Sequence, residues 1–244
     1  MKTKTVLVTG ASSGIGLALA TCLLEKGARV IGTSRDKRRL KDLKIAYEDR
    51  FFAHNLDATD HESCISIVGR LPDEWQEIDI LVNNAGSDVG GRRDFQDGRL
   101  EDWLNTVETN VNGVIRVTHA VIRGMQDRGE GDIVNIGSTS GVEPTPTTTV
   151  YSASKHAING FSESLRKENE NTNVRIMQVL PGMVRTEFAA TRFADAKKGE
   201  AFYDNFGKWL FPEDVANAVM YLLEQPRHVC IPQLVIVPRP AEQT

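Results

Sequence analysis

The chain has 244 residues, which suffices for one large domain with a sizeable buried core. Hydrophobic residues make up 40% of it and charged residues 25%, as is ordinary for a soluble globular protein. The formal net charge of −4 argues against a nucleic-acid partner or a membrane-surface partner. No apolar run approaches the ~20 residues of a membrane-spanning helix. Residues 1–4 lead directly into a strand-like segment, without the cleavage site of a signal peptide.

The three cysteines, Cys22, Cys64 and Cys230, are isolated and odd in number. This pattern fits a reducing compartment and small core side chains rather than disulfides or a metal site. We therefore expect a cytoplasmic protein without a metal centre.

Short apolar runs alternate along the chain with segments of helical periodicity. The predicted strands cover residues 4–9, 29–34, 50–54, 78–82, 132–136, 174–180 and 229–237. The predicted helices cover residues 15–26, 36–48, 60–69, 100–111, 113–128, 150–169 and 212–224. Because strands and helices alternate, we predict an α/β fold: a doubly wound parallel sheet of the Rossmann type in three αβα layers. No linker or repeat divides the chain, so residues 1–244 are predicted to form one domain.

A glycine-rich turn joins the first predicted strand to the first predicted helix. Gly10, Gly14 and Gly16 leave room for a backbone to approach a pyrophosphate, whose charge would meet the helix amino terminus. Ser12 and Ser13 can add hydroxyl donors. The plain alternative is an ordinary tight turn, but the position between a strand and a helix favours nucleotide binding.

The end of the second predicted strand distinguishes NADP from NAD. An acidic residue there would bind the ribose 2′-hydroxyl, whereas an arginine accommodates a 2′-phosphate. Ser34 can hydrogen-bond a phosphate and Arg35 can pair with it in bidentate fashion, which predicts NADP(H) rather than NAD(H). The next residues are assigned instead to a solvated helix face and its N-cap: Asp36, Lys37, Arg38 and Arg39.

Tyr151 and Lys155 are four residues apart, so on a helix they lie on one face, one turn from each other. A neighbouring ammonium favours the phenolate and moves the tyrosine pKa toward the working range of an acid–base catalyst. Ser138 follows the predicted strand at 132–136, at the carboxyl end where ligands bind in such sheets. A Tyr–Lys pair alone is also compatible with an ordinary helix start and a surface lysine.

Further motifs occur in a fixed order with these residues: Thr9 to Gly16, Asn83 to Gly86, Asn110, Ser138, Tyr151-x-x-x-Lys155 and Pro181-Gly182. With them the chain resembles the short-chain dehydrogenase/reductase family over essentially its whole length. The resemblance implies hydride transfer between NADP(H) and a carbonyl or secondary alcohol.

The resemblance also implies roles for single residues. Tyr151 would be the general acid or base, Ser138 would bind the reacting oxygen, and Asn110 would anchor a water that relays protons. Lys155 would lower the Tyr151 pKa and hold the nicotinamide ribose. The implied cofactor-binding residues, with Asp57 at the adenine and the last four at the nicotinamide, are Gly10, Ser12, Ser13, Gly14, Ile15, Gly16, Ser34, Arg35, Asp57, Asn83, Ala85, Gly86, Tyr151, Lys155, Pro181, Gly182, Val184 and Thr186.

Two departures from the family pattern leave alternatives open. Residues 231–240 lack the Asp-Gly-Gly segment of the ketoacyl reductases and are more like the small-alcohol and hydroxy-acid branch, which also puts a tetramer contact in doubt. In NADP-dependent members of the family a basic residue commonly precedes the glycine that corresponds to Gly14. This chain has Ser13 there, so one of the two sequence signals for NADP is absent. The alternatives are an NAD-dependent alcohol or hydroxy-acid dehydrogenase, a 3-oxoacyl reductase, an epimerase, for which the chain is short, or an NADP-binding regulator, which typically lacks the catalytic Tyr or Lys.

Residues 186–212 are predicted to form an irregular lid over the substrate. Seven of the sixteen aromatic residues lie in or beside it: Phe188, Phe193, Phe202, Tyr203, Phe206, Trp209 and Phe211. If they close over the nicotinamide, the substrate is an apolar carbonyl compound or alcohol; alternatively they pack the lid against the core or another subunit. The threonines within residues 142–150 offer hydroxyl groups but no positive charge, so this segment does not indicate an anionic substrate. The resemblance further implies a homodimer or homotetramer built on the helices predicted at 100–128 and 150–169.

Overall fold

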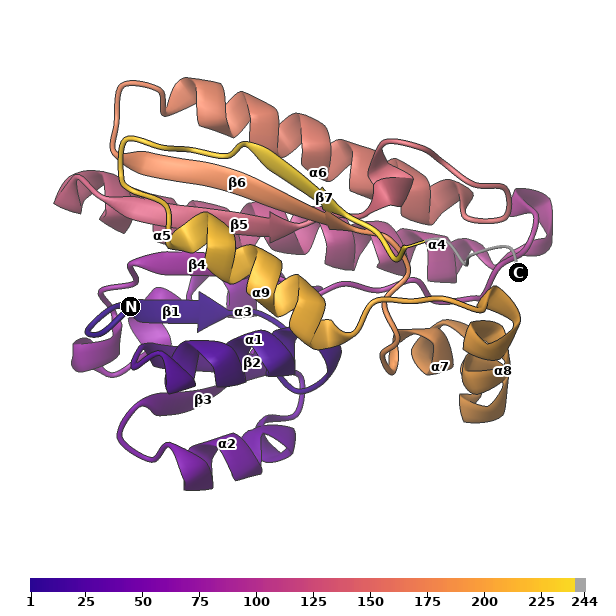
Figure 1. Cartoon of the computed structure of the whole chain (residues 1–244), viewed down its shortest axis with the longest axis horizontal. Coiled ribbons are helices and arrows are strands. Elements are labelled where there is room, and N and C mark those ends of the chain that lie inside the picture. Colours follow the sequence, from indigo (N-terminus) through magenta and orange to yellow (C-terminus); the bar gives the residue numbers. More distant parts are fainter. Residues whose placement is uncertain (240–244) are drawn as a thin grey trace.

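The computed structural model describes residues 1–239, apart from the side chain of Phe206. Its centre is a seven-stranded sheet in the order β3-β2-β1-β4-β5-β6-β7, in which all neighbours are parallel (Figure 1). The strands are β1 Thr5–Val8, β2 Arg29–Ser34, β3 Phe51–Asn55, β4 Ile80–Asn83, β5 Gly131–Ile136, β6 Val174–Pro181 and β7 Gln233–Ile236. The doubly wound parallel sheet is thus confirmed, and its order reverses between β1 and β4, where ligands bind in such sheets.

The last strand, β7, is shorter than the predicted span of residues 229–237. Pro232 and Pro238 lie just outside it, and a proline has no amide hydrogen for a ladder bond. β7 therefore pairs with β6 only from Gln233 to Ile236.

The helices lie on both faces of the sheet and at its carboxyl edge. They are α1 Gly14–Glu25, α2 Lys41–Ala46, α3 His61–Ile65, α4 Leu100–Val107, α5 Gly113–Arg128, α6 Thr149–Glu168, α7 Phe188–Phe193, α8 Ala196–Phe206 and α9 Pro212–Leu223. The helices predicted at 36–48 and 60–69 are interrupted, because 3₁₀ turns occupy Lys37–Leu40 and Val68–Arg70. Within residues 1–239, no helix has both the length and the apolar character needed to cross a bilayer.

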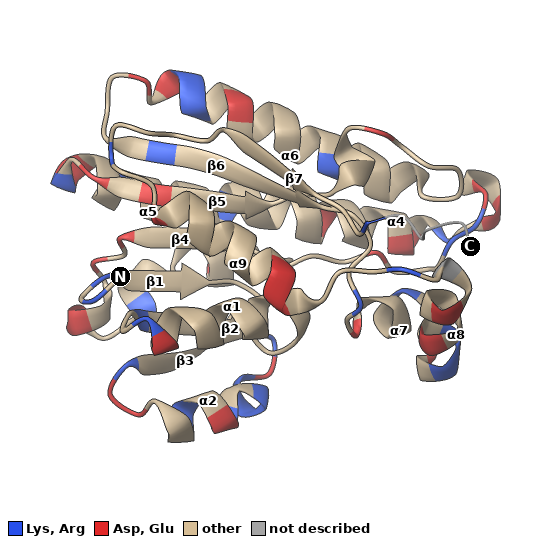
Figure 2. Ribbon diagram, in the orientation of Figure 1, with Lys and Arg blue, Asp and Glu red and all other residues tan. Residues whose placement is uncertain are grey.

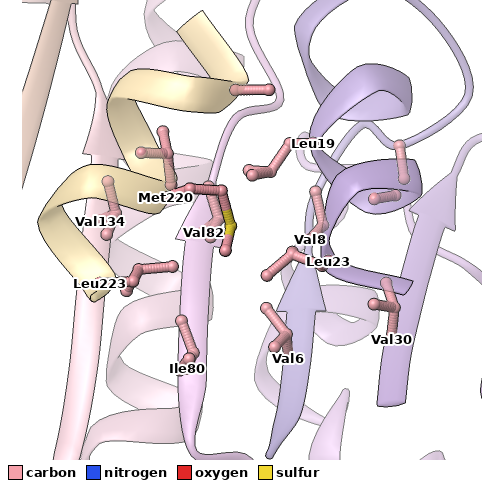
Figure 3. Packing of buried hydrophobic residues seen from close by; sticks show 14 of the residues in the cluster. Val6, Val8, Leu19, Leu23, Val30, Ile80, Val82, Val134, Met220 and Leu223 are labelled. Carbon is pink, nitrogen blue, oxygen red and sulfur yellow. The ribbon is translucent and has the colours of Figure 1, made fainter. Parts of the chain in front are cut away.

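Alternating side chains of the strands build one core on each face of the sheet. Val6 and Val8 point to the face covered by α1 and α9, whereas Leu7 between them points to the face covered by α3 and α5. Figure 3 shows the first core, where Leu23 of α1 and Met220 of α9 meet the strand side chains. These two cores fix the helices against the sheet and leave its carboxyl edge for other contacts.

Charged residues lie mostly on helices and loops, while the strands are largely uncharged (Figure 2). Besides Arg29 at the start of β2, the strands contain a buried ion pair between Asp132 of β5 and Arg175 of β6. Its Nε–Oδ1 and Nη2–Oδ2 distances are 2.7 and 3.0 Å. Arg175 also donates to the Val229 carbonyl at 2.9 Å, so the pair holds the segment that leads into β7.

The segment predicted as an irregular lid is instead a pair of helices, α7 and α8, beside the carboxyl ends of the strands (Figure 1). Asp195 caps α8 by accepting bonds from two backbone amides, and Gly207 ends it in the left-handed region with φ +78°. A Cβ added at Gly199 would lie 2.6 Å from the Ala190 nitrogen, so α8 packs tightly against α7. The prediction of irregular structure was wrong because these caps were not considered.

Truncation of Leu23 tests the core formed by α1 and α9. Leu23 is fully buried, so Leu23→Ala should lower the free energy of unfolding by about 2–5 kcal/mol. The control Ile45→Ala changes a side chain that is 67% exposed and should stay within about 0.5 kcal/mol. Urea denaturation at equilibrium measures both; similar losses for the two variants would contradict this description of the core.

Candidate functional site

A cavity of about 700 Å³ runs along the carboxyl edge of the sheet and reaches α7 and α8. It is lined by nearly all the predicted site residues: Gly10, Ser12, Ser13, Gly14, Ile15, Ser34, Arg35, Asp57, Ala85, Gly86, Ser138, Tyr151, Lys155, Pro181, Gly182, Val184 and Thr186. Three predicted residues, Gly16, Asn83 and Asn110, are not among its lining residues. The fold therefore brings together motifs that are far apart in the sequence.

The glycine turn has the shape that a pyrophosphate needs. Gly10 and Gly14 have φ values of +68° and +51°, a region that side-chain-bearing residues rarely adopt. Gly14 begins α1, so the helix amino terminus faces the cavity. A Cβ added at Gly16 would lie 2.2 Å from the Gly10 carbonyl oxygen, so Gly16 serves the packing of the turn rather than the cavity wall.

The segment at the end of β4 supports the turn. Asn83 is buried and donates to Thr118 and Asn135, so it holds the sheet together and is not among the residues that line the cavity. Asn84, which was not singled out, lines the cavity and donates to the carbonyls of Thr9 and Gly10 at 2.9 and 3.1 Å. Asn84 thereby fixes the glycine turn relative to β4.

Two arginines near the end of β2 line the cavity, whereas only one was predicted to do so. Arg35 and Arg39 both line it, although Arg39 was assigned to a solvated helix face. Arg39 forms an ion pair with Glu187, next to α7, with an Nη2–Oε2 distance of 2.9 Å. Arg38 is instead bound by Asp36, whose carboxylate also caps the 3₁₀ turn as predicted. These bonds to Arg38 lower the pKa of Asp36 to about 2.

Ser138, Tyr151 and Lys155 meet at the centre of the cavity. Tyr151 and Lys155 lie one turn apart on α6, with the ammonium nitrogen 5.8 Å from the centre of the phenol ring. Ser138 follows β5, and its hydroxyl lies near the Tyr151 hydroxyl and lowers the Tyr151 pKa. Lys155 donates to the carbonyl of Ile136, the last residue of β5, at 3.0 Å. β5 and α6 therefore position all three groups.

The charge that favours the phenolate comes from an unexpected residue. Burial raises the pKa of Tyr151, while the charge of Arg192 and the hydroxyl of Ser138 lower that pKa. The guanidinium carbon of Arg192 lies 5.6 Å from the centre of the Tyr151 ring. Burial also lowers the pKa of Lys155 to about 8. Arg192 is thus a second cation beside Lys155 at Tyr151, and the effect of Lys155 on the Tyr151 pKa stays a prediction.

Asn110 lies behind the cavity in a π-helical turn, Glu108–Asn112, between α4 and α5. Its side chain accepts from the Ser87 amide at 2.7 Å and donates to the Ser87 carbonyl and to Ser154. Such turns widen a helix locally and are frequent at functional sites. Asn110 thus ties the segment after β4 to α6, the helix that carries Tyr151 and Lys155.

The aromatic residues of the lid contact one another and the catalytic region. Tyr203 is buried and donates to the Val184 carbonyl at 3.0 Å, which anchors α8 to the segment after β6. Phe188 packs against Tyr151 with ring centres 6.0 Å apart. Of the seven aromatic residues predicted to surround the substrate, Phe188, Phe202 and Tyr203 line the cavity, whereas Phe211 is 57% exposed.

Three charged residues near the lid were missed by sequence reasoning. Arg192 of α7 and Asp88, which follows β4, form a buried ion pair with an Nε–Oδ2 distance of 2.6 Å. Arg92 lines the cavity beside them and donates to Thr145 at 3.0 Å. The available signal was the presence of two arginines and an aspartate in segments already expected to border the site.

Comparisons with known proteins assign the family. A protein-family model described as short chain dehydrogenase matches residues 4–197, most of the chain. The chain belongs to this family. Its sequence is 37% identical over 240 residues to a probable NADP-dependent dehydrogenase of Haemophilus influenzae, covering 98% of this chain and 94% of that protein. It is 39% identical over 235 residues to an NADP-dependent 3-hydroxy acid dehydrogenase of Escherichia coli K12, covering 96% of this chain and 94% of that protein.

A solved structure of a closed serine dehydrogenase with NADP⁺ is also similar. Its TM-score is 0.91 at 38% identity, covering 95% of this chain and 94% of that one. The family match and these relatives together show that the chain is an NADP(H)-dependent oxidoreductase that acts on a hydroxyl or carbonyl group. The prediction of NADP(H) over NAD(H) is confirmed, and the glycine turn with Arg35 and Arg39 fits this cofactor.

We expect Arg39 to contribute to the preference for the 2′-phosphate. Arg39→Ala removes a cation that lines the cavity near the end of β2 and should weaken NADPH binding about tenfold or more, with NADH affinity unchanged. Arg38→Ala is the matched control, because Asp36 already holds that guanidinium. Fluorescence titration at fixed salt measures the NADPH affinity of both variants. Equal effects of the two substitutions would contradict a contact between Arg39 and the 2′-phosphate.

Proposed function

We propose that the protein interconverts the hydroxyl and carbonyl groups of a short hydroxy acid, with Tyr151 as the general acid or base. The observation that carries this proposal is the contact of Ser138 with Tyr151 inside the cavity, next to Lys155. Bound NADP(H) supplies or accepts the hydride. Side chains of this protein would bind the substrate oxygen and transfer the proton.

Ser138 and Tyr151 can both hydrogen-bond one substrate oxygen, because they face the same part of the cavity. In reduction Tyr151 would donate its proton to that oxygen, and in oxidation it would accept the proton. The charge of Arg192 stabilises the phenolate against the cost of burial. Lys155 uses one of its three donors on the Ile136 carbonyl, which leaves two for the hydroxyls of the nicotinamide ribose.

Asn110 would support a water that passes protons to Lys155. A Cβ added at Gly86 would lie 3.6 Å from the Asn110 Oδ1 atom and 3.9 Å from the Lys155 nitrogen, so both atoms border the same small space. A buried water requires polar partners of this kind. The remaining bonds of Asn110 to Ser87 and Ser154 keep its oxygen in place.

The substrate we propose is an acid rather than the apolar compound expected from the lid aromatics. Two of the relatives are a 3-hydroxy acid dehydrogenase and a serine dehydrogenase, and the names of both refer to acids that bear a hydroxyl group. Two arginines, Arg92 and Arg192, line the cavity near the lid next to aromatic side chains, and Asp88 is paired with Arg192. Such a wall is better suited to a carboxylate than to an apolar group.

We also propose that the protein forms a homo-oligomer through α4, α5 and α6. Leu100 and Leu104 of α4 and Ile115 of α5 are exposed by 61, 59 and 41%. Large apolar side chains exposed on neighbouring helices are typical of a protein interface. Light scattering would show a dimer or tetramer; a monomer would refute the proposal.

Replacement of Tyr151 tests the acid–base assignment. Tyr151→Phe keeps the ring packed on Phe188 but removes the proton, so kcat should fall by about 10²–10⁴. NADPH affinity should change little, which fluorescence titration of the same variant would show. Undiminished turnover with intact NADPH binding would contradict the role of Tyr151.

The pH dependence of NADPH binding tests the role of Lys155. Burial lowers the Lys155 pKa to about 8, and donation to ribose hydroxyls favours the charged ammonium, so binding should raise that pKa. NADPH affinity should therefore be constant just below pH 8 and fall above it by up to tenfold per pH unit, since the free protein then has to take up a proton. Lys155→Met should abolish this dependence. A flat wild-type profile between pH 7.5 and 9.5 would speak against the assignment.

A further inference from the structure

The lid end of the cavity contains more positive than negative charge. Arg192 of α7 and Arg92 after β4 both line the cavity, and one carboxylate, Asp88, lies between the elements that carry them. The charges of both arginines and of Lys155 lower the pKa of Asp88, against the raising effect of its burial. Asp88 pairs with Arg192, and the cavity-lining Glu187 pairs with Arg39, so among residues 1–239 no ion pair involves Arg92.

Burial makes this excess charge costly. The side chains of Arg192 and Asp88 are only 9 and 4% exposed, and burial together with the charge of Arg192 lowers the pKa of Arg92. Arg192 has Asp88 as its counter-ion, whereas Arg92 is only partly buried and has no ion pair among the described residues, so a bound anion would be stabilised at Arg92. The bond of Arg92 to the neutral hydroxyl of Thr145 does not compensate the charge.

The two guanidiniums also retain hydrogen-bonding capacity. Among the described residues, the Nε atoms of Arg92 and Arg192 are buried and have no hydrogen-bond partner of suitable geometry. The 2.6 Å contact of Arg192 with Asp88 is close but poorly aligned for such a bond. A carboxylate can accept two parallel bonds from a guanidinium, which Asp88 does not provide here.

The surroundings hold Arg192 at a fixed place relative to the reacting groups. Its guanidinium carbon lies 5.2 Å from the ring centre of Phe188, 5.6 Å from that of Tyr151 and 5.8 Å from that of Phe202. The guanidinium carbon of Arg92 is likewise 5.8 Å from the Phe202 ring centre. Only a few atoms can therefore separate a group bound by these arginines from an oxygen bound by Tyr151.

We propose that Arg92 and Arg192 form a subsite for the carboxylate of a short hydroxy acid, and that Asp88 positions Arg192 within it. The inference rests on the proposed function, because it assumes that the reacting hydroxyl lies at Ser138 and Tyr151. The carboxylate sets the orientation of the substrate along the cavity. Since Arg192 belongs to α7, the subsite is complete only with the lid in the position described above.

Calorimetry of a non-reacting ligand pair tests the subsite without turnover. The probes are butyrate and butyramide, titrated into the protein saturated with NADP⁺, so that the phosphate-binding sites are occupied. Wild type should bind butyrate at least tenfold more tightly than butyramide, because charge-assisted bonds exceed neutral ones. Arg192→Gln and Arg92→Gln should each reduce this preference about tenfold, while Arg192→Lys should retain part of it.

The matched control is Arg185→Gln, which changes an arginine just before the lid segment that is not among the residues lining the cavity and is paired with Glu200. It should leave the preference for butyrate unchanged. Thermal melting shows whether each variant is folded, and Arg92→Gln gives the test if Arg192→Gln is not. Equal binding of the two probes by wild type, or an unchanged preference in the folded arginine variants, would overturn the subsite. Failure of the proposed function is seen separately, as absence of turnover on hydroxy acids despite preserved carboxylate binding.

Discussion

The site depends on one constraint, the parallel pairing of neighbouring strands. Because all strands run in the same direction, the residues that follow β1, β2, β4, β5 and β6 emerge at one edge. Side-chain bonds to the backbone then fix these segments relative to each other. Asn84 links the glycine turn to β4, Lys155 links α6 to the end of β5, and Asn110 links the segment after β4 to α6. Distances within the cavity are therefore set by the sheet rather than by flexible loops.

A second set of contacts connects this edge to the lid through charge. Arg192 of α7 is paired with Asp88 after β4, and Arg39 after β2 is paired with Glu187 just before α7. The first pair is buried and the second exposed, so removal of one partner should be far more costly in the first. Through Arg192 the position of the lid also affects the Tyr151 pKa. In the proposed function, substrate recognition and acid–base chemistry would thus share one side chain, Arg192.

Much of this arrangement could be predicted from the sequence, because it rests on local patterns. The glycine turn, the parallel strands and the Tyr151–Lys155 pair each depend on spacing within a few residues. The contacts of Asp88 with Arg192 and of Arg39 with Glu187 join residues far apart in the chain, and no periodicity indicates them. The helices α7 and α8 were missed for a different reason: their caps, Asp195 and Gly207, are visible in the sequence but were not considered.

The apolar substrate suggested by those aromatic residues is a prediction that the structure does not test, and the same limit applies to it. Composition indicated which side chains lie in the lid, but it did not indicate that arginines would lie over their rings. Phe188 and Phe202 have Arg192 within 5.8 Å of their ring centres, so the aromatic wall carries positive charge. The chemical character of the cavity therefore follows from tertiary contacts and not from the aromatic content of the segment.

The most direct measurement is the rate of NADP⁺ reduction by the unmodified protein with 3-hydroxybutyrate and with its methyl ester. The two compounds present the same secondary alcohol, and only the acid carries a charge for Arg92 and Arg192. We predict that kcat/KM is at least tenfold higher for the acid. Equal values, or a preference for the ester, would contradict the proposal that this protein is a hydroxy-acid dehydrogenase.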